Sequence, residues 1–186
     1  NLIFDDTTLS YFEKAIKTVW DITPMNIITP EIVRMWDTNW DCLVNENFID
    51  KKIGYHKKSN PYKDSGIKGD VSIEKVQNTL TPQTRFKFSS GWFTCISGRL
   101  LRKIGIPESF GHHGFDDTFI MVASEKLKQL SNEDIQQFKL KNVVVCENHK
   151  YRNHSHYINN LSVYDRRESF KQIAESNFMK ELEKIN

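Results

Sequence analysis

The chain has 186 residues, of which 38% are hydrophobic, so it is long enough for one domain with a buried core. Its formal net charge is only +2 and its lysines and arginines are spread along the chain, which disfavours nucleic acid but remains compatible with a small anionic ligand. No apolar run is long enough to span a bilayer, and no signal peptide is visible. We therefore expect a single domain over residues 1–186, with no nucleic-acid partner and no integral membrane segment.

The three cysteines are far apart and form no C-x-x-C pair: they are Cys42, Cys95 and Cys146. This pattern disfavours a disulfide framework or a zinc-thiolate site and is typical of small core residues in a reducing compartment. We expect a cytoplasmic protein, and attachment to the surface of a membrane stays open. Because the opening NLIFDD reads as the interior of a strand, we also expect the chain to be a fragment of a longer protein.

The first predicted elements are a short strand at residues 2–4 and a helix behind it. Ser10 and Glu13 have the S-x-x-E spacing of a capping box, which predicts the start of the helix, and Pro24 predicts its end. The helical spacing predicts a buried face made of Phe12, Ala15, Ile16 and Val19. MNIITPEIVRMW then reads as a strand followed by a turn or a second short element.

A predicted loop occupies the middle of the chain. Residues 50–70 are rich in lysine, glycine and turn formers, and we expect a long mobile loop of the kind that often acts as a lid. RFKFSSGWFTCISG alternates aromatic and polar residues before it breaks at Gly91. Ser97 is then predicted to cap a short helix, GRLLRKIG, that Gly105 ends.

Helix, strand and helix follow in the last part of the chain. Asp117 can cap a helix whose apolar positions are Phe119, Ile120, Ala123, Leu127 and Leu130. Residues 143–146, VVVC, read as a β-branched strand. An amphipathic helix closes the chain, and its apolar positions include Phe170, Ile173 and Leu182. Because strands and helices interleave, we expect an α/β fold.

Two pairs of aspartates are the first candidates for chemistry. Asp5 and Asp6 end a predicted strand, and adjacent carboxylates repel each other unless a cation or hydrogen-bond donors compensate; Mg²⁺ or Mn²⁺ would do so. An ordinary aspartate turn is the alternative. Asp116 and Asp117 lie where a helix begins, a position that favours the ionised form needed by a general base. A plain helix cap accounts for one of them, but less well for two.

Histidines and tryptophans supply further candidates. His149, His154 and His156 follow the last predicted strand, and each is either a metal ligand or a polar loop residue. Trp36 and Trp40 lie among amides and acids in RMWDTNWDCLVN, which suits the binding of a sugar as well as a place in the core. For Trp20 we favour a core position.

Taken in this order, these pieces resemble the second half of a GT-A-fold glycosyltransferase of the family-two type. IFDDTTLSYF resembles the strand and aspartate motif that in this family holds a divalent metal on the nucleotide-sugar diphosphate. The most specific match, SSGWFTCISGRLLRKIGIPESFGHHGFDDTFIMVAS, is similar to the family's small-residue segment, its short helix and the acidic pair that opens a further helix. NHKYRNHSH looks like the region where a histidine can serve as a further metal ligand.

The resemblance implies a partial GT-A fold, a mixed sheet flanked by helices, and a metal-dependent glycosyltransferase. It places the metal motif near residues 5–6, the acceptor and catalytic region at 86–124, and a C-terminal loop and helix at 147–186. The partners would be a nucleotide-sugar donor and a saccharide or other hydroxyl acceptor, and the cofactor would be Mn²⁺ or Mg²⁺.

The resemblance also implies a role for each candidate residue. Asp117 would take the proton from the acceptor hydroxyl, with Asp116 or His113 orienting it. The implied metal ligands are Asp5, Asp6 and His154 or His156. The implied substrate contacts are Gly91, Trp92, His113, Trp36 and Trp40. From the charge and expected mobility of the predicted loop, and not from the resemblance, we also expect its lysines from Lys51 to Lys68 to close over the phosphates.

Several departures from the family bear on these roles. The N-terminal nucleotide-binding βαβ half, which normally precedes the metal motif, is absent. An Asp-Asp pair replaces the usual Glu-Asp, which leaves the base open between Asp116 and Asp117, and GHHG replaces the commoner W-G at the acceptor subsite.

Two other functions stay open. A phosphoester hydrolase would use the same Asp and His clusters to hold two metals about 3.5–4 Å apart, and a non-catalytic saccharide-binding or interaction module would keep the fold without donor chemistry. The transferase requires the two acid pairs to converge on one cleft.

Overall fold

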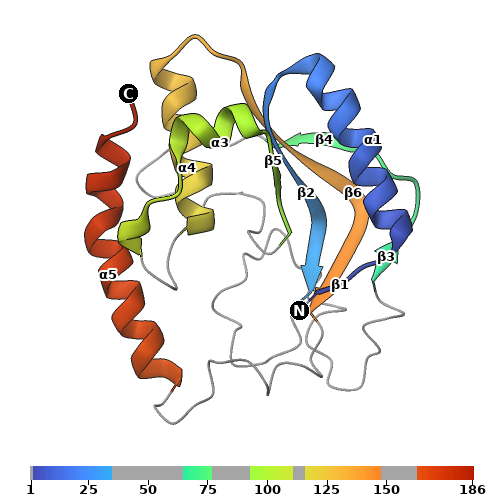
Figure 1. Cartoon of the computed structure of the whole chain (residues 1–186). Coiled ribbons are helices and arrows are strands. Elements are labelled where there is room, and N and C mark those ends of the chain that lie inside the picture. Colours follow the sequence, from blue (N-terminus) through green and yellow to red (C-terminus); the bar gives the residue numbers. More distant parts are fainter. Residues whose placement is uncertain (1, 35–64, 77–92, 111–115, 148–162) are drawn as a thin grey trace.

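The computed structural model describes residues 2–34, 65–76, 93–110, 116–147 and 163–186. A mixed sheet lies between two helical layers (Figure 1). The described elements are β1 (Leu2–Ile3), α1 (Asp6–Ile22), β2 (Met25–Arg34), β3 (Gly66–Ile67), β4 (Ile73–Val76), β5 (Cys95–Ile96), α3 (Gly98–Ile104), the 3₁₀ turn η2 (Glu108–Phe110), α4 (Asp116–Leu130), β6 (Ile135–Glu147) and α5 (Val163–Glu183). The expected α/β class, with a mixed sheet flanked by helices, is confirmed.

Two long parallel strands, β2 and β6, form the centre of the sheet. Their register joins Met25 to Ile135 at the amino end and Arg34 to Cys146 at the carboxyl end, with an irregularity after Pro30. β5 pairs antiparallel with β2. β1, β3 and β4 pair antiparallel with β6, one after another along the edge that β2 does not occupy.

Pairing between segments that are far apart in the chain makes the strands longer and more numerous than the local sequence predicts. The strand predicted at 143–146 is part of the longer β6, and the predicted loop at 50–70 contains β3, whose two residues pair with β6. Asn142 interrupts β6 with a φ of 63°, and its backbone N–H donates to Glu31 Oε2 on β2 at 2.6 Å. This bond satisfies a donor that the irregular ladder would leave unpaired.

α1 begins earlier than the predicted capping box. Asp5 is the N-cap, and its Oδ1 accepts hydrogen bonds from the backbone N–H of Thr8 at 2.7 Å and from Thr8 Oγ1 at 2.9 Å. Ser10 and Glu13 lie inside the helix, where Glu13 forms an ion pair with a lysine one turn later. The capping-box prediction is therefore wrong, whereas the helix does end just before Pro24.

One face of the sheet packs against α1. The buried side chains of this core are Phe12, Ala15, Val19, Ile28, Phe138, Leu140 and Val143. Ile16 and Trp20 were expected to be buried too, but they are 42% and 53% exposed. Of the helices described, only α1 packs on this face, so only its stripe facing the sheet is covered.

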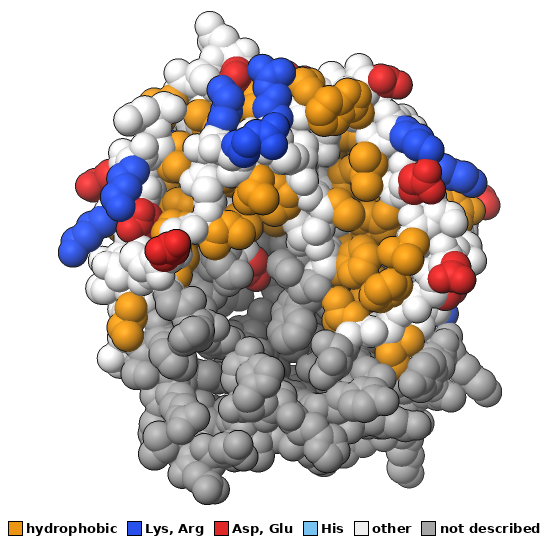
Figure 2. Space-filling view, in the orientation of Figure 1, with side chains coloured by type: hydrophobic (Ala, Val, Ile, Leu, Met, Phe, Trp, Pro, Cys, Tyr) orange, Lys and Arg blue, Asp and Glu red, His pale blue; other side chains and the backbone are white. Residues whose placement is uncertain are grey.

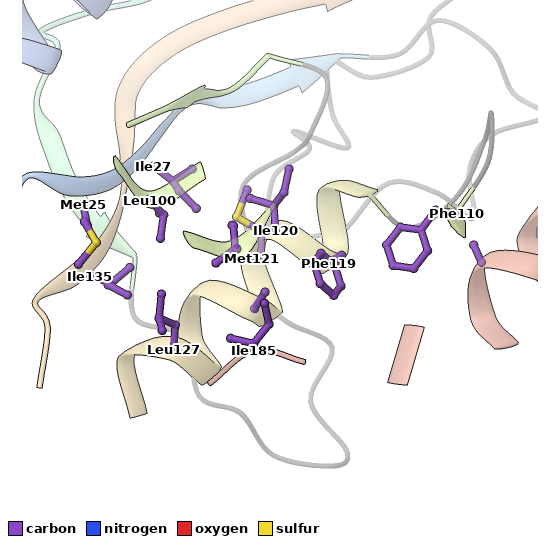
Figure 3. Packing of buried hydrophobic residues seen from close by; sticks show 13 residues of the cluster. Met25, Ile27, Leu100, Phe110, Phe119, Ile120, Met121, Leu127, Ile135 and Ile185 are labelled. Atoms are coloured by element: carbon purple, nitrogen blue, oxygen red, sulfur yellow. The ribbon is translucent and has the colours of Figure 1, made fainter. Parts of the chain in front are cut away.

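The opposite face packs against α3, α4 and α5 (Figure 3). Neighbouring residues of β2 show the division: Ile27 belongs to this core and Ile28 to the core under α1, since successive strand residues point to opposite faces. The buried side chains here are Met25, Ile27, Leu100, Ile104, Phe110, Phe119, Ile120, Met121, Ala123, Leu127, Ile135, Ala174 and Ile185. Ile173 was expected to face the core, but it is exposed because the neighbouring Ala174 takes that position.

The predicted boundaries of α3 are confirmed, and one predicted core position of α4 is not. Ser97 caps α3 by accepting a hydrogen bond from the backbone N–H of Leu100, and Gly105 ends it with a φ of 67°. Leu130 has the helical spacing of a buried residue but is 59% exposed. As the last residue of α4, it lies beyond the core, which ends at Leu127 on this helix.

α1 and α4 both run antiparallel to β2 and β6. Ile3 pairs with Cys146, so α1 starts at the carboxyl end of the parallel strands and returns to their amino end, where Thr23 ends it. α4 folds back along β6, with Gln137 Nε2 donating to the backbone O of Met121 at 3.5 Å. The N-termini of both helices therefore lie at the carboxyl end of the sheet.

Candidate functional site

The carboxyl end of the β2–β6 pair is the candidate site because both predicted acid pairs lie there. Asp5 and Asp6 open α1, and Asp116 and Asp117 open α4 (Figure 1). In open α/β sheets ligands bind outside the carboxyl ends of the strands, and the free backbone N–H groups of a helix N-terminus attract anions. The two helices cover opposite faces of the sheet, so the acid pairs lie on opposite sides of it. The described residues do not bring the two pairs together in one cleft.

Asp5 is held in place by the helix that it caps. Its Oδ1 accepts both hydrogen bonds from Thr8, which is the ordinary capping role that the sequence left open beside a metal-binding role. Its Oδ2 takes no hydrogen bond from any described residue. One carboxylate oxygen is thus used by the cap, and the other remains available for a ligand.

Gly66 faces this second oxygen. A Cβ atom at Gly66 would lie 3.1 Å from Asp5 Oδ2, and the residue has a φ of 93°, where glycine is favoured. Pairing with Val144 on β6 fixes the glycine beside the acid. The sequence analysis did not single out Gly66. Its signal is a glycine inside a short strand, which often marks the close approach of another group.

Asp6 and the Oδ2 atom of Asp5 are the described candidates for binding a divalent metal. Both residues are exposed, and Mg²⁺ commonly takes one or two carboxylates, with waters and substrate phosphates completing its shell. The pair fits that minimal donor set. Within the described ranges no group of three or more His, Cys, Asp or Glu side chains could hold a metal. A metal here would therefore depend on phosphate, water or ligands from other residues.

The prediction that Asp117 caps α4 is wrong, because Asp117 lies inside the first turn of the helix. α4 begins at Asp116, and Asp117 Oδ1 accepts a hydrogen bond from the backbone N–H of Thr118 at 2.7 Å. Negative charge in the first turn of a helix is stabilised by about 0.3–1 kcal/mol. The arrangement orients the carboxylate.

An aromatic pair lies next to Asp5. Phe4 directly precedes Asp5 and is partly exposed, and its ring packs edge-on against Phe93 with 5.1 Å between centroids. Phe93 also packs against the buried Phe12. The predicted aromatic platform consisted of tryptophans and did not include Phe4 or Phe93. Phe93 follows the predicted contact Trp92, which was the available signal.

The remaining predicted site residues lie outside the described residues: they are Trp36, Trp40, Gly91, Trp92, His113, His149, His154 and His156. In the sequence, the first two tryptophans follow Arg34, the last residue of β2, and the three later histidines follow Glu147, the last residue of β6. Their roles stay predictions.

Comparisons with protein-family models, curated proteins and solved structures gave no match for this chain. Of the described helices, none combines the length and apolar character needed to cross a membrane. The functional argument therefore depends on the geometry of the site and on the motifs of the sequence.

Proposed function

We propose that this domain is a metal-dependent glycosyltransferase module that transfers a sugar from a nucleotide-sugar donor to an acceptor hydroxyl. The observation that supports the proposal is that both acid pairs open helices that run antiparallel to the same two strands and begin toward the carboxyl ends of those strands. The cleft shared by the two pairs is part of the proposal. The mixed sheet flanked by helices is compatible with a partial GT-A fold, in which β1 and the start of α1 would form the metal motif.

Asp5 and Asp6 would hold Mn²⁺ or Mg²⁺ together with the donor diphosphate. The bound metal would neutralise charge on the departing nucleoside diphosphate. The cap uses Oδ1 of Asp5, and Gly66, which has no Cβ, lies beside Oδ2. His154 or His156 remains the predicted further ligand.

Asp117 would act as the base. Its carboxylate would accept the proton of the acceptor hydroxyl while that oxygen bonds to the anomeric carbon and the bond from that carbon to the diphosphate breaks. The backbone N–H of Thr118 donates a hydrogen bond to Asp117 Oδ1 and so orients the carboxylate. Asp116 or His113 would orient it, with Trp36, Trp40, Gly91 and Trp92 contacting the substrates.

A non-catalytic saccharide-binding module is the second candidate. The cap formed by Asp5 and the bond between Asp117 and Thr118 give both carboxylates a structural role that needs neither metal nor donor. No observation on the described residues favours the phosphoester hydrolase, whose predicted histidine ligands lie outside those residues.

Calorimetric titration separates these candidates. The transferase predicts that UDP or GDP binds only with Mn²⁺. Binding of metal alone together with phosphatase turnover would instead indicate the hydrolase, and binding of a saccharide without nucleotide or metal would indicate the non-catalytic module.

Variants of the acid pair make the test specific. Asp5→Asn keeps the helix cap, since asparagine caps as well as aspartate, but removes the charge; Asp5→Ala loses the cap as well and costs about 1 kcal/mol of stability. We expect Asp5→Asn and Asp6→Asn to abolish Mn²⁺-dependent nucleotide binding without unfolding. Asp21→Asn, near the other end of α1, is the matched control. Unchanged Mn²⁺-dependent nucleotide binding in Asp5→Asn would show that Asp5 acts only as a helix cap.

A further inference from the structure

Four large apolar side chains are exposed at the amino end of the sheet, opposite to the acid pairs. They are Trp20 and Ile22 in the last turn of α1, Ile106 after α3, and Leu130 at the end of α4, and they are between 53% and 59% exposed. A bond from Thr23 Oγ1 to the backbone O of Asp134 ties the end of α1 to the turn between α4 and β6. Other exposed apolar side chains lie elsewhere, among them Phe4 and Leu9 near the carboxyl end, but the four at the amino end lie close to the cations of α3.

α3 adds positive charge to the same end. Its outward side chains Arg99, Arg102 and Lys103 are exposed, and the helix contains no acidic residue. The helix is anchored here because the backbone N–H of Ser97 donates to the O of Asn26 at the start of β2. Figure 2 shows Lys and Arg side chains gathered over the region of α3, with hydrophobic side chains close by.

Acidic side chains at this end leave the charge on α3 exposed. Glu133 is paired with Lys103 at 2.7 Å and lies 3.9 Å from Arg99, so it neutralises one of these cations. Asp134 accepts hydrogen bonds from a neighbouring glutamine, and Asp21 lies on α1. The cations of this end are concentrated on α3, where no described acid forms an ion pair with Arg102.

We propose that this amino-end surface, formed by Trp20, Ile22, Arg99, Arg102, Lys103, Ile106 and Leu130, docks reversibly on an anionic phospholipid membrane. Tryptophan and branched apolar side chains insert at the level of the headgroups, while arginine and lysine reach the lipid phosphates. Nucleic acid would satisfy the cations but offers no apolar phase for the four exposed side chains. The proposal does not depend on the transferase activity.

Co-sedimentation with lipid vesicles at low ionic strength tests the docking. We expect the protein to bind vesicles of phosphatidylcholine mixed with phosphatidylserine and to bind pure phosphatidylcholine much more weakly. Arg99→Gln combined with Arg102→Gln should weaken binding by up to about 25-fold, because each cation contributes about fivefold, or about 1 kcal/mol. Lys14→Gln combined with Lys75→Gln, away from this surface, should have little effect.

A matched pair on α1 tests the apolar part of the surface. Ile22→Gln should weaken vesicle binding by about tenfold, because insertion buries much of this side chain. Leu9→Gln removes a similarly exposed side chain near the opposite end of the helix and should leave binding unchanged. Both sites are exposed, so folding is retained. Equal binding to both vesicle types, no vesicle binding, or equal loss in the two α1 variants would overturn the proposal.

Discussion

The two ends of the β2–β6 pair differ in chemistry. At the carboxyl end, α1 and α4 begin with Asp5, Asp6, Asp116 and Asp117, and at the amino end α3 exposes a cluster of cations beside large apolar side chains. Both ends are built by the same helices and strands. The sheet therefore separates a region suited to a metal and phosphates from a region suited to an anionic surface.

Part of this contrast follows from helix direction alone. Aspartate is favoured at a helix N-terminus and lysine or arginine at a C-terminus, because each complements the partial charge there. α1 and α4 both start at the carboxyl end, so acids would gather there in the absence of any ligand. Two features that capping does not require are more informative. Gly66 lies close to Asp5 Oδ2, and Arg102 on α3 forms no ion pair with a described residue.

The largest expected effect comes from Asp117→Asn at the carboxyl end. The amide can still accept the hydrogen bond from Thr118 but cannot take a proton, so transfer should fall by about 10²–10⁴-fold with folding and Mn²⁺-dependent nucleotide binding retained. Turnover of a panel of UDP- and GDP-sugars measures this. Asp134→Asn at the amino end should stay within twofold of the parent. A variant that unfolds, with activity tracking stability, would make Asp117 structural.

A smaller effect is expected from alanine at two strained glycines. Gly66 and Gly69 have φ values of 93° and 153°, and a Cβ would lie 3.1 Å from Asp5 Oδ2 in the first case and 3.2 Å from Asn142 Nδ2 in the second. Each alanine should cost about 1–3 kcal/mol in the free energy of unfolding, measured in urea. Only Gly66→Ala should also weaken Mn²⁺-dependent nucleotide binding. Equal weakening of nucleotide binding by the two alanine variants would show that Gly66 has no specific role in the site.

The smallest effect concerns Glu74 on β4, which belongs to neither end. Hydrogen bonds from Lys139 and Lys141 hold the pKa of Glu74 below its ordinary value of 4.5. Since the pKa is lower in the folded state, the ion pairs stabilise the fold above the unfolded pKa, and this stability is lost as the pH falls through the folded pKa. Glu74→Gln should be slightly less stable than the parent at neutral pH and equally stable at pH well below 4.5.

Urea unfolding at the two pH values measures the difference. A stability gap that persists at low pH would show that Glu74 contributes through packing rather than charge. Metal-dependent nucleotide binding should be unchanged in this variant, because Glu74 pairs with Lys139 away from the acid pairs.

Local signals predicted those elements whose ends are set by a single residue. Ser97 and Gly105 bound α3, and Pro24 follows the end of α1, because caps and proline act within a few residues of the chain. The predictions that were wrong depended on distant partners. Trp20 is exposed because no described element covers its side of α1, and β3 forms because β6 pairs with it.

The sequence predicts where the candidate acid pair lies but not what each carboxylate does. A strand that runs into Asp5 and Asp6 locates the pair, yet an aspartate that caps a helix and one that binds a metal look alike in a sequence. Gly66 and Phe93 were missed because their contacts with residues 4–5 join segments far apart in the chain.

Paramagnetic broadening by Mn²⁺ in an NMR spectrum, recorded with UDP or GDP present, tests most directly whether the two acid pairs serve one ligand. We expect the amide signals of Asp6, Gly66 and Thr118 to lose intensity together, while those of Ile22 and Leu130 at the amino end persist. Broadening confined to Asp6 and Gly66 with Thr118 unaffected, or equal broadening at both ends of the sheet, would contradict a shared site.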